Sequence, residues 1–279
     1  MDRMIIVVLL LALGYFAVDK FVLAPAQVDV ARESSPLAPV DAKSIAVLAF
    51  ANLSSDKDNE YFSDGVAEEI LNALARIEGL RVAGRTSSFY FKGRNESLAT
   101  IGSTLGVAHV LEGSVRKQGE RLRISAQLIR VGDGIQLWSE TFDGTDADIF
   151  ALQEHIAREV SRELKVALTV DEDQRLVNAG TANPEAYALY LRATEIFNRR
   201  EAERYEEGIA AARQALRLDP GFARAHSRLA TLYYLWANVA VPERHEHLIA
   251  EAVRHAQSAL DLDPQLAEPH AVLALLHWT

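Results

Sequence analysis

The spacing of apolar residues changes character along this chain, and each change predicts a different element. Residues 44–50, Ser-Ile-Ala-Val-Leu-Ala-Phe, are a short and almost continuous apolar run, which predicts a strand covered on both faces. A polar loop follows, and apolar residues then recur at helical spacing over residues 62–77. Gly79 is expected to end that helix. Residues 80–91 are predicted to form a second strand and its irregular exit.

A second helix and a change of period come next. The stripe over residues 98–105 predicts a helix that stops at Gly106. Residues 122–129 alternate between apolar and polar, the rhythm of a strand with one dry face. Turn sequences at 117–120 and 131–134 flank this strand, so three antiparallel strands are expected in meander order.

Asp148 opens a last apolar stripe, which predicts a helix through residue 164. The predicted order over residues 43–170 is therefore β-α-β-α-β-β-β-α, a small α+β domain.

The last hundred residues repeat a phrase. Leu-Arg-Leu-Asp-Pro at 216–220 recurs as Leu-Asp-Leu-Asp-Pro at 260–264, an offset of 44 residues. Self-similarity around a helix-ending proline indicates a helical solenoid. An all-α solenoid of about two and a half units is thus predicted over residues 183–279, with surplus residues in an insertion around 238–247. Its final unit stops after one helix. We expect either a truncated product that frays after about Leu266 in hydrogen exchange, or a helix completed by a partner.

The amino terminus differs from the rest of the chain. Residues 4–18 are uninterrupted apolar, and the run resumes after Asp19 and Lys20. Extended to residue 24 at about 1.5 Å each, a helix here reaches roughly the 30 Å of a hydrocarbon core. We expect residues 1–24 to be an uncleaved transmembrane anchor. A removable signal peptide ending near Ala24-Pro25-Ala26 and a buried core helix are the alternatives.

Residues 25–42 carry prolines and serines without periodicity and are expected to be a disordered linker. The single arginine before the apolar run favours a body outside the cytoplasm. A single-pass protein of the inner membrane, with its body in the periplasm, is the expected localisation.

Composition and motifs argue against several classes of function. The net charge is −10 and no segment is basic, so a nucleic-acid partner is not expected. There is no cysteine, which excludes disulfides and thiolate metal sites. No catalytic motif is present, and neither a metal nor a cofactor is expected. Glu68 and Glu69 are adjacent on a helix and point apart, so they are interpreted as a solvated face rather than an acid–base pair.

Two groups of residues are candidates for binding. Arg85 and Ser87 follow the second predicted strand and could hold an anion or a partner's carboxylate, although a turn that satisfies its own backbone fits as well. In the repeat region the candidate peptide-binding residues are Arg224, Ser227, Thr231 and Tyr234, the last of which can equally be a packing residue.

Five separated motifs then point to a family. Residues 44–48, 59–65, 85–89, 111–115 and 137–140 resemble, in order, the TolB-like amino-terminal domain. The resemblance covers about residues 43–165, and the segment after it resembles tetratricopeptide repeats. On the repeat pattern, the four candidate residues above would line the concave face.

The resemblance has functional implications. Members of this family usually carry the domain between a membrane helix and tetratricopeptide repeats, and many bear a CadC-type winged helix, a cyclase or a kinase on the cytoplasmic side. We expect a membrane-tethered, non-catalytic scaffold or sensor that binds a protein or peptide.

The alternative is the sensory part of a CadC-like regulator or of a cyclase-linked signalling protein. An in-frame effector domain encoded upstream of Met1 would decide for it. An enzyme would require a pocket with close, perturbed titratable groups.

Overall fold

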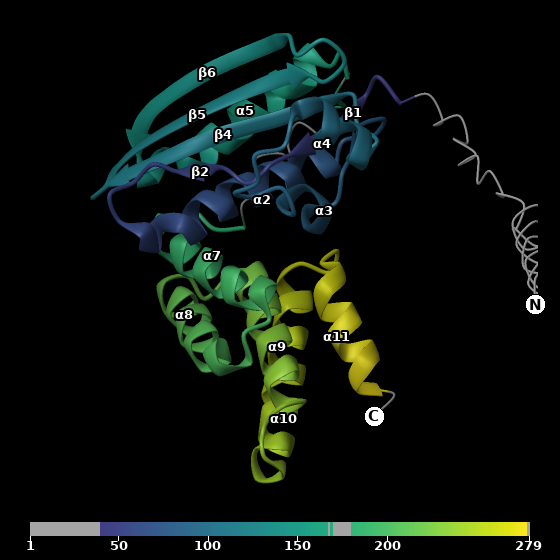
Figure 1. The fold of residues 1–279 in the computed structure, drawn as a ribbon. Helices are drawn as coiled ribbons and strands as arrows, with labels where there is room; N and C mark the ends of the chain where they lie inside the picture. The colour runs from purple at the N-terminus through teal and green to yellow at the C-terminus, as the bar shows by residue number, and fades with distance from the viewer. Residues whose placement is uncertain (1–39, 167, 170–179, 278–279) are drawn as a thin grey trace, which may run out of the picture. The chain divides into compact units, whose positions relative to one another are not determined.

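The computed structural model of the protein describes residues 40–166, 168–169 and 180–277 (Figure 1). The elements below all belong to one compact unit, which begins at Asp41. The anchor predicted at residues 1–24 lies outside the described residues, as does nearly all of the linker predicted at 25–42. Within the described part, no helix combines the length and the apolar character needed to cross a bilayer.

The first part of this unit is a mixed α+β fold around a six-stranded sheet. Its strands are β1 (Ser44–Val47), β2 (Ala51–Asn52), β3 (Arg81–Val82), β4 (His109–Gln118), β5 (Arg121–Arg130) and β6 (Gln136–Thr145). Its helices are α2 (Glu60–Ala75), α3 (Arg85–Phe89), α4 (Leu98–Leu105) and α5 (Ile149–Glu163), with 3-10 turns at Lys57–Asn59 and Asp146–Asp148.

The sheet order is β3-β1-β4-β5-β6, and β2 also pairs with β4. Strand β1 runs parallel to β3 and β4, whereas β4, β5 and β6 are antiparallel neighbours, so the predicted meander is confirmed. All four residues of β1 are buried, because α2 and α5 cover one face of the sheet and α4 packs over Ala46 and Val110 on the other. The predicted two-sided burial of this strand is therefore confirmed.

One predicted helix end is confirmed, and two predicted boundaries differ from the structure. Helix α4 ends at Gly106 as predicted, because this glycine adopts the left-handed conformation with φ 64° that closes the helix. The predicted irregular exit over residues 80–91 is wrong in part: β3 has only two residues, and Arg85–Phe89 is a short helix. A five-residue helix is too short to show a periodic pattern in the sequence. Helix α2 ends at Ala75, before Gly79.

The second part consists of helices only. They are α7 (Pro184–Arg199), α8 (Tyr205–Leu218), α9 (Ala223–Ala237), α10 (Pro242–Leu262) and α11 (Ala267–His277), with a 3-10 turn at Ala202–Arg204. Each helix packs on the next one along the chain, and α9 also contacts α7 and α11. Both copies of the repeated phrase do end a helix: Asp219 and Asp263 are equivalent carboxy-terminal caps of α8 and α10.

The surplus in the 44-residue interval is mostly helix rather than a loop. Helix α10 has 21 residues against 14 in α8, and it begins at Pro242, inside the insertion predicted around residues 238–247. A proline in the first turn lacks only an N–H that would have no partner there, so it suits a helix start. His245 and His247 thus lie on an exposed extension of α10.

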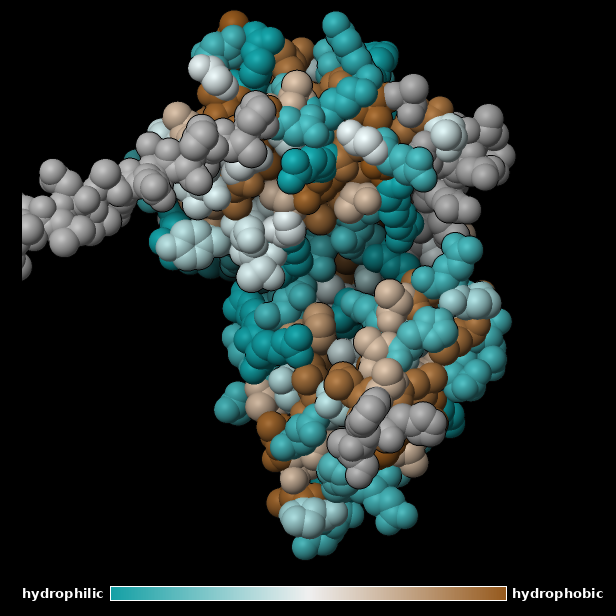
Figure 2. Space-filling model, turned by 90° about the vertical axis from the view of Figure 1, so that its right-hand side faces the viewer, coloured by the Kyte–Doolittle hydropathy of each residue, from teal (hydrophilic) through white to brown (hydrophobic). Residues whose placement is uncertain are grey.

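The two parts share one hydrophobic core. The cluster that contains the sheet, α2 and α5 also contains Tyr187, Tyr190 and Leu191 of α7, and Phe222 at the start of α9. A second cluster fills the space among the later helices. Figure 2 shows hydrophobic side chains exposed among hydrophilic ones on the surface of the helical part, where Leu275 of α11 is 49% exposed.

Candidate functional site

A row of acidic side chains on α2 forms the polar contact between the sheet domain and the helices. Asp64, Glu68 and Glu69 all lie on α2, and each binds a cation outside α2. Glu68 and Glu69 are the two that contact the helical part, at Asn198 and Arg224. The side chains of Glu68 and Glu69 are 13% and 10% exposed. The sequence-based interpretation of these two glutamates as a solvated face is therefore wrong. They do point to different partners, as adjacent helix residues must.

Glu69 pairs with Arg224 of α9. The Arg224 guanidinium donates to both carboxylate oxygens of Glu69, with 2.6 Å between Nη1 and Oε2, and Nη2 also lies 3.1 Å from the Tyr190 hydroxyl. Only 13% of the arginine side chain is exposed. Burial alone would lower the pKa of Arg224, but the Glu69 carboxylate and Tyr190 outweigh it and raise that pKa well above its usual value. Arg224 is therefore charged and fixed in place.

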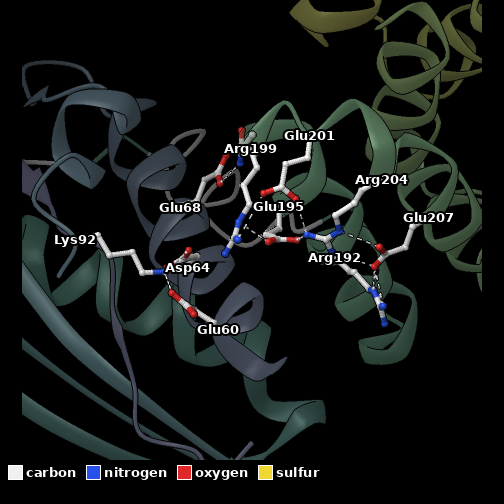
Figure 3. A network of polar contacts seen from close by, with 11 residues as sticks. Glu60, Asp64, Glu68, Lys92, Arg192, Glu195, Arg199, Glu201, Arg204 and Glu207 are labelled. Atoms are coloured by element: carbon white, nitrogen blue, oxygen red, sulfur yellow. Dashed lines mark hydrogen bonds and ion pairs between the residues drawn. The ribbon is translucent and has the colours of Figure 1, made fainter. Parts of the chain in front are cut away.

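Glu68 contacts two other elements. Its Oε2 accepts from Arg85 Nε of α3 at 2.7 Å and from Asn198 Nδ2 of α7 at 3.0 Å. Figure 3 shows Glu68 beside Arg199 at the end of α7. The Arg85 guanidinium also lies 4.4 Å from the centre of the Phe89 ring. Burial raises the pKa of Glu68, and Arg85 and Arg228 oppose that rise. One carboxylate thus connects the short helix α3 to the helical part.

Further ion pairs flank this contact in Figure 3. Lys92 lies 2.5 Å from Glu60 and 2.7 Å from Asp64, on the α2 side. Burial raises the pKa of Asp64, while Lys92 acts in the opposite direction. On the other side, charged residues of α7, of α8 and of the connection between them form ion pairs with one another. They are Arg192, Glu195, Arg199, Glu201, Arg204 and Glu207.

Arg228 links three helices in the helical part. It is 4% exposed, and it donates to Thr194 of α7 at 3.2 Å and to Glu268 of α11 at 3.2 Å. The Arg228 pair and the Ser227 hydroxyl lower the pKa of Glu268, although burial opposes them. Arg228 therefore fixes the first turn of α11 against α9.

The four predicted peptide-binding residues differ in accessibility. Arg224 is held by Glu69, and Ser227 is 2% exposed and donates to Glu268 at 3.1 Å. Thr231 and Tyr234 lie further along α9 and are partly exposed; the Thr231 hydroxyl donates to the Ser227 carbonyl at 3.0 Å. Two of the four therefore support the fold, and only Thr231 and Tyr234 present surface to a ligand.

The two residues of the second predicted site, Arg85 and Ser87, also differ in accessibility. Arg85 is committed to Glu68, and Ser87, two residues later in α3, is exposed. Its amide donates to the Gly84 carbonyl at 3.1 Å, so the backbone of this segment is satisfied within the turn. Among the described residues, no group of three or more histidines and carboxylates could hold a metal ion.

Gly65 is a usable sequence signal for this contact. It lies in the interior of α2, where glycine is unfavourable by about 1 kcal/mol relative to alanine. A Cβ at this position would lie 2.7 Å from Leu191 Cδ2 of α7. A glycine inside an amphipathic helix, beside acidic residues, therefore indicates that another helix packs closely there.

One curated protein resembles most of this chain. "Putative adenylate cyclase 3" of Rhizobium meliloti (strain 1021) is 39% identical over 204 residues, which cover 73% of this chain and 35% of that protein. The chain thus spans about a third of the length of this relative. No protein-family model matches the chain.

Solved structures resemble smaller portions. TolB from Acinetobacter baumannii has a TM-score of 0.34 at 16% identity, covering 45% of this chain and 29% of its own. Lipoprotein GNA1162 from Neisseria meningitidis has a TM-score of 0.33 at 19% identity, covering 46% of this chain and 99% of its own. The LpoB carboxy-terminal domain from Salmonella enterica has a TM-score of 0.31 at 17% identity, covering 37% and 82%.

Proposed function

We propose that this chain is a non-catalytic interaction module, tethered to the inner membrane with its body in the periplasm, that binds a protein or peptide partner through its tetratricopeptide-like helices. The observation that carries the proposal is the junction at Glu69 and Arg224. It makes the sheet domain and the helices one body, so that a ligand bound to the helices acts on the sheet domain as well. The apolar run at residues 4–18 supports the tether.

The accessible end of α9 supports a binding role for the helices. Tyr234 and Thr231 are partly exposed on α9, beyond the buried residues that hold α9 to its neighbours. Tyrosine combines a large apolar ring with a hydroxyl and is enriched in protein interfaces. The peptide would contact this end of α9 and not the buried Arg224.

A photo-crosslinking experiment tests the site in the full chain. A photoreactive amino acid replaces Tyr234 in one variant and Arg213, on the exposed side of α8, in the matched control. We expect crosslinked adducts of defined mass from position 234, formed only when membranes are present, and none from position 213. Equal adducts from both positions, or none from position 234, would contradict the proposal. A periplasmic reporter fused after Thr279 checks the topology, since activity confined to the cytoplasm would refute it.

A truncation at Asn183 is a poor version of this experiment. It removes Tyr187, Tyr190 and Phe222 from the core that the sheet domain shares. Loss of binding in such a fragment would report on folding. Point variants in the full chain avoid that ambiguity.

The similarity to the putative adenylate cyclase favours a second function. The chain matches a segment of a protein named as a putative adenylate cyclase, so it can be the regulatory part of a cyclase-linked signalling system. A chimera in which this chain replaces the matching segment of that relative tests the idea. We expect cyclic AMP output to survive, and an Arg224→Met change to alter it. Output that is insensitive to the junction would argue against regulation through this segment.

A further inference from the structure

Helix α4 packs over Val110 at one end of the outer face of the meander, and the rest of that face is polar. Along β5, Leu122, Ile124 and Leu128 are buried against α2 and α5, so the residues between them point to the opposite side. In Figure 1 the helices α2 and α5 lie on one side of these strands. The outward-facing set is Glu112, Ser114, Arg116 and Gln118 of β4, Arg121, Arg123, Ser125 and Gln127 of β5, and Ser139, Thr141, Asp143 and Thr145 of β6.

Three arginines gather at one end of this face. The register places Arg116 directly opposite Arg123, and Gln118 opposite Arg121. Asp143 pairs with Arg123, at 2.6 Å between Nε and Oδ1. Arg116 and Arg121 are exposed, and neither has an ion-pair partner among the described residues.

The Arg116–Arg123 pair works against the stability of the sheet. Like charges directly opposite each other on neighbouring strands destabilise a sheet. The chain carries a net charge of −10, and an acidic residue at position 116 would attract Arg123 where the arginine repels it. A cationic end on an acidic protein is instead suited to holding an anionic group, and the planar guanidinium matches a carboxylate with two hydrogen bonds.

The face is hollowed along its length. A depression of about 590 Å³ is lined by the three arginines with Gln118, Asp143 and Thr145, and a second of about 440 Å³ is lined by Glu112, Ser114, Ser125, Gln127 and Ser139. Arg116 and Glu112 are four residues apart on β4, or about 13 Å at 3.3 Å per residue. An extended peptide of about six residues spans both depressions.

We infer that this face binds an extended acidic segment of a partner protein, whose carboxylates lie on Arg116 and Arg121. Its uncharged remainder lies along the hydroxyls of Ser114 and Ser125 toward Glu112. The Glu112 carboxylate, which accepts from Gln127, repels acidic groups and so fixes the direction of the segment. The inference rests on the proposed function only in assuming a protein partner, and it concerns a different surface from α9.

Other anionic ligands fit the face less well. In β4, β5 and β6, all fully described, no outward-facing side chain is aromatic, because Trp138 and Phe142 belong to the covered side. Nucleic-acid bases and sugars therefore have no ring to stack on. An anionic membrane surface would meet Glu112 and Asp143 together with the arginines, and these carboxylates reduce its attraction.

A peptide titration of the full chain tests the inference. The probe is a fluorescent ten-residue peptide with four glutamates at one end and serine and glycine elsewhere, and its reference has glutamine in place of glutamate. The variant is Arg116→Gln with Arg121→Gln, and the matched control is Arg213→Gln with Arg217→Gln, two exposed arginines of α8. Thermal unfolding of each protein reports whether it is folded.

We expect the acidic probe to bind the unaltered chain and the α8 control with similar Kd. Binding to the Arg116 and Arg121 variant should weaken at least about tenfold, while its unfolding temperature stays the same or rises because a like-charge contact is removed. A Glu112→Gln variant should bind the probe more tightly, because it removes the repelling carboxylate. Three results would overturn the inference: no binding by the unaltered chain, equal weakening in the α8 control, or binding to vesicles with 30% phosphatidylserine without binding to the peptide. Because the probe does not depend on the natural partner or on position 234, this result stands or falls separately from the crosslinking.

Discussion

Arg224 of α9 and Glu69 of α2 form a buried, two-pronged ion pair between residues 155 positions apart in the chain. It lies beside the aromatic contact of Tyr190 with Phe222, whose ring centres are 5.1 Å apart. Charge and apolar packing therefore hold the same two segments together. The following changes separate these contributions.

Glu69→Gln should cost about 3–5 kcal/mol of unfolding free energy, because it leaves the Arg224 charge buried without its counter-charge. Denaturant unfolding of the full chain measures this. Arg192→Gln breaks an exposed pair with Glu207 and should cost no more than about 1 kcal/mol. The double change Glu69→Leu with Arg224→Met should recover much of the loss. Equal costs for Glu69→Gln and Arg192→Gln would contradict the role of the buried pair.

Gly65→Ala should destabilise the chain, although alanine is the better helix former by about 1 kcal/mol. The new Cβ would lie 2.7–2.8 Å from the methyl carbons of Leu191, which is only 1% exposed and has little room to move. Overpacking of this kind costs about 1–3 kcal/mol. Calorimetry of Gly65→Ala alone and with Leu191→Ala measures the coupling. Additive effects in the double variant would show that the two positions do not press on each other.

Tyr187→Phe should cost about 1–3 kcal/mol, since it leaves a buried amide without its partner. Gln153 Nε2 donates to the Tyr187 hydroxyl at 2.7 Å, and both side chains are buried. Gln153→Leu combined with Tyr187→Phe removes both partners and should be closer to neutral than Tyr187→Phe alone. Chemical denaturation compares the two. A double variant less stable than the single one would show that the hydrogen bond is not the cause.

Stability should fall as the pH drops from about 6.5 to about 4, because of His255. Burial, Arg254 and His226 lower the pKa of His255 from 6.5 to about 4. In this range the unfolded chain binds a proton that the folded chain does not, so protonation favours unfolding by up to about 3 kcal/mol. The ring is held in the neutral form by Arg254 Nη2, 2.9 Å from Nε2, and by His226 Nδ1, 2.9 Å from its own Nδ1. The other groups that face it are Glu251, Arg213 and Tyr233.

Unfolding free energies measured at pH 7 and pH 4.5 give the slope of stability against pH. His255→Gln should flatten it, whereas His247→Gln, at an exposed position of the same helix, should leave it unchanged. A slope that survives in His255→Gln would assign the pH dependence to other groups. His226 and His109 would be examined next, because burial lowers the pKa of both in the same direction.

The regular elements of this fold are predictable because their patterns are local. Leu122, Ile124 and Leu128 alternate with polar residues as one strand, and Gly106 marks the end of a helix whatever lies around it. The helix at Arg85–Phe89 is not predictable from periodicity, since five residues complete little more than one turn. The first turns of α10 resemble an insertion in the sequence because their charged, exposed residues have no apolar stripe.

The junction escapes prediction for a different reason. The rule that neighbouring helix residues point apart is correct for Glu68 and Glu69, but it says nothing about partners 130 or 155 positions later. A carboxylate on a helix surface looks the same in sequence whether water or a distant arginine faces it. The close approach of α7, for which Gly65 leaves room, covers Glu68, and Arg224 of α9 covers Glu69.

The shared core also determines how this chain can be recombined with others. A chimera cut at the apparent boundary near residue 183 would separate the sheet from Tyr187, Tyr190 and Phe222, which complete its core. A portable segment should therefore run from Ser44 through the end of α9 at Ala237, which keeps Leu191 opposite Gly65 and Arg224 opposite Glu69. Foreign helices grafted in place of α7 to α9 would have to supply an equivalent leucine and arginine.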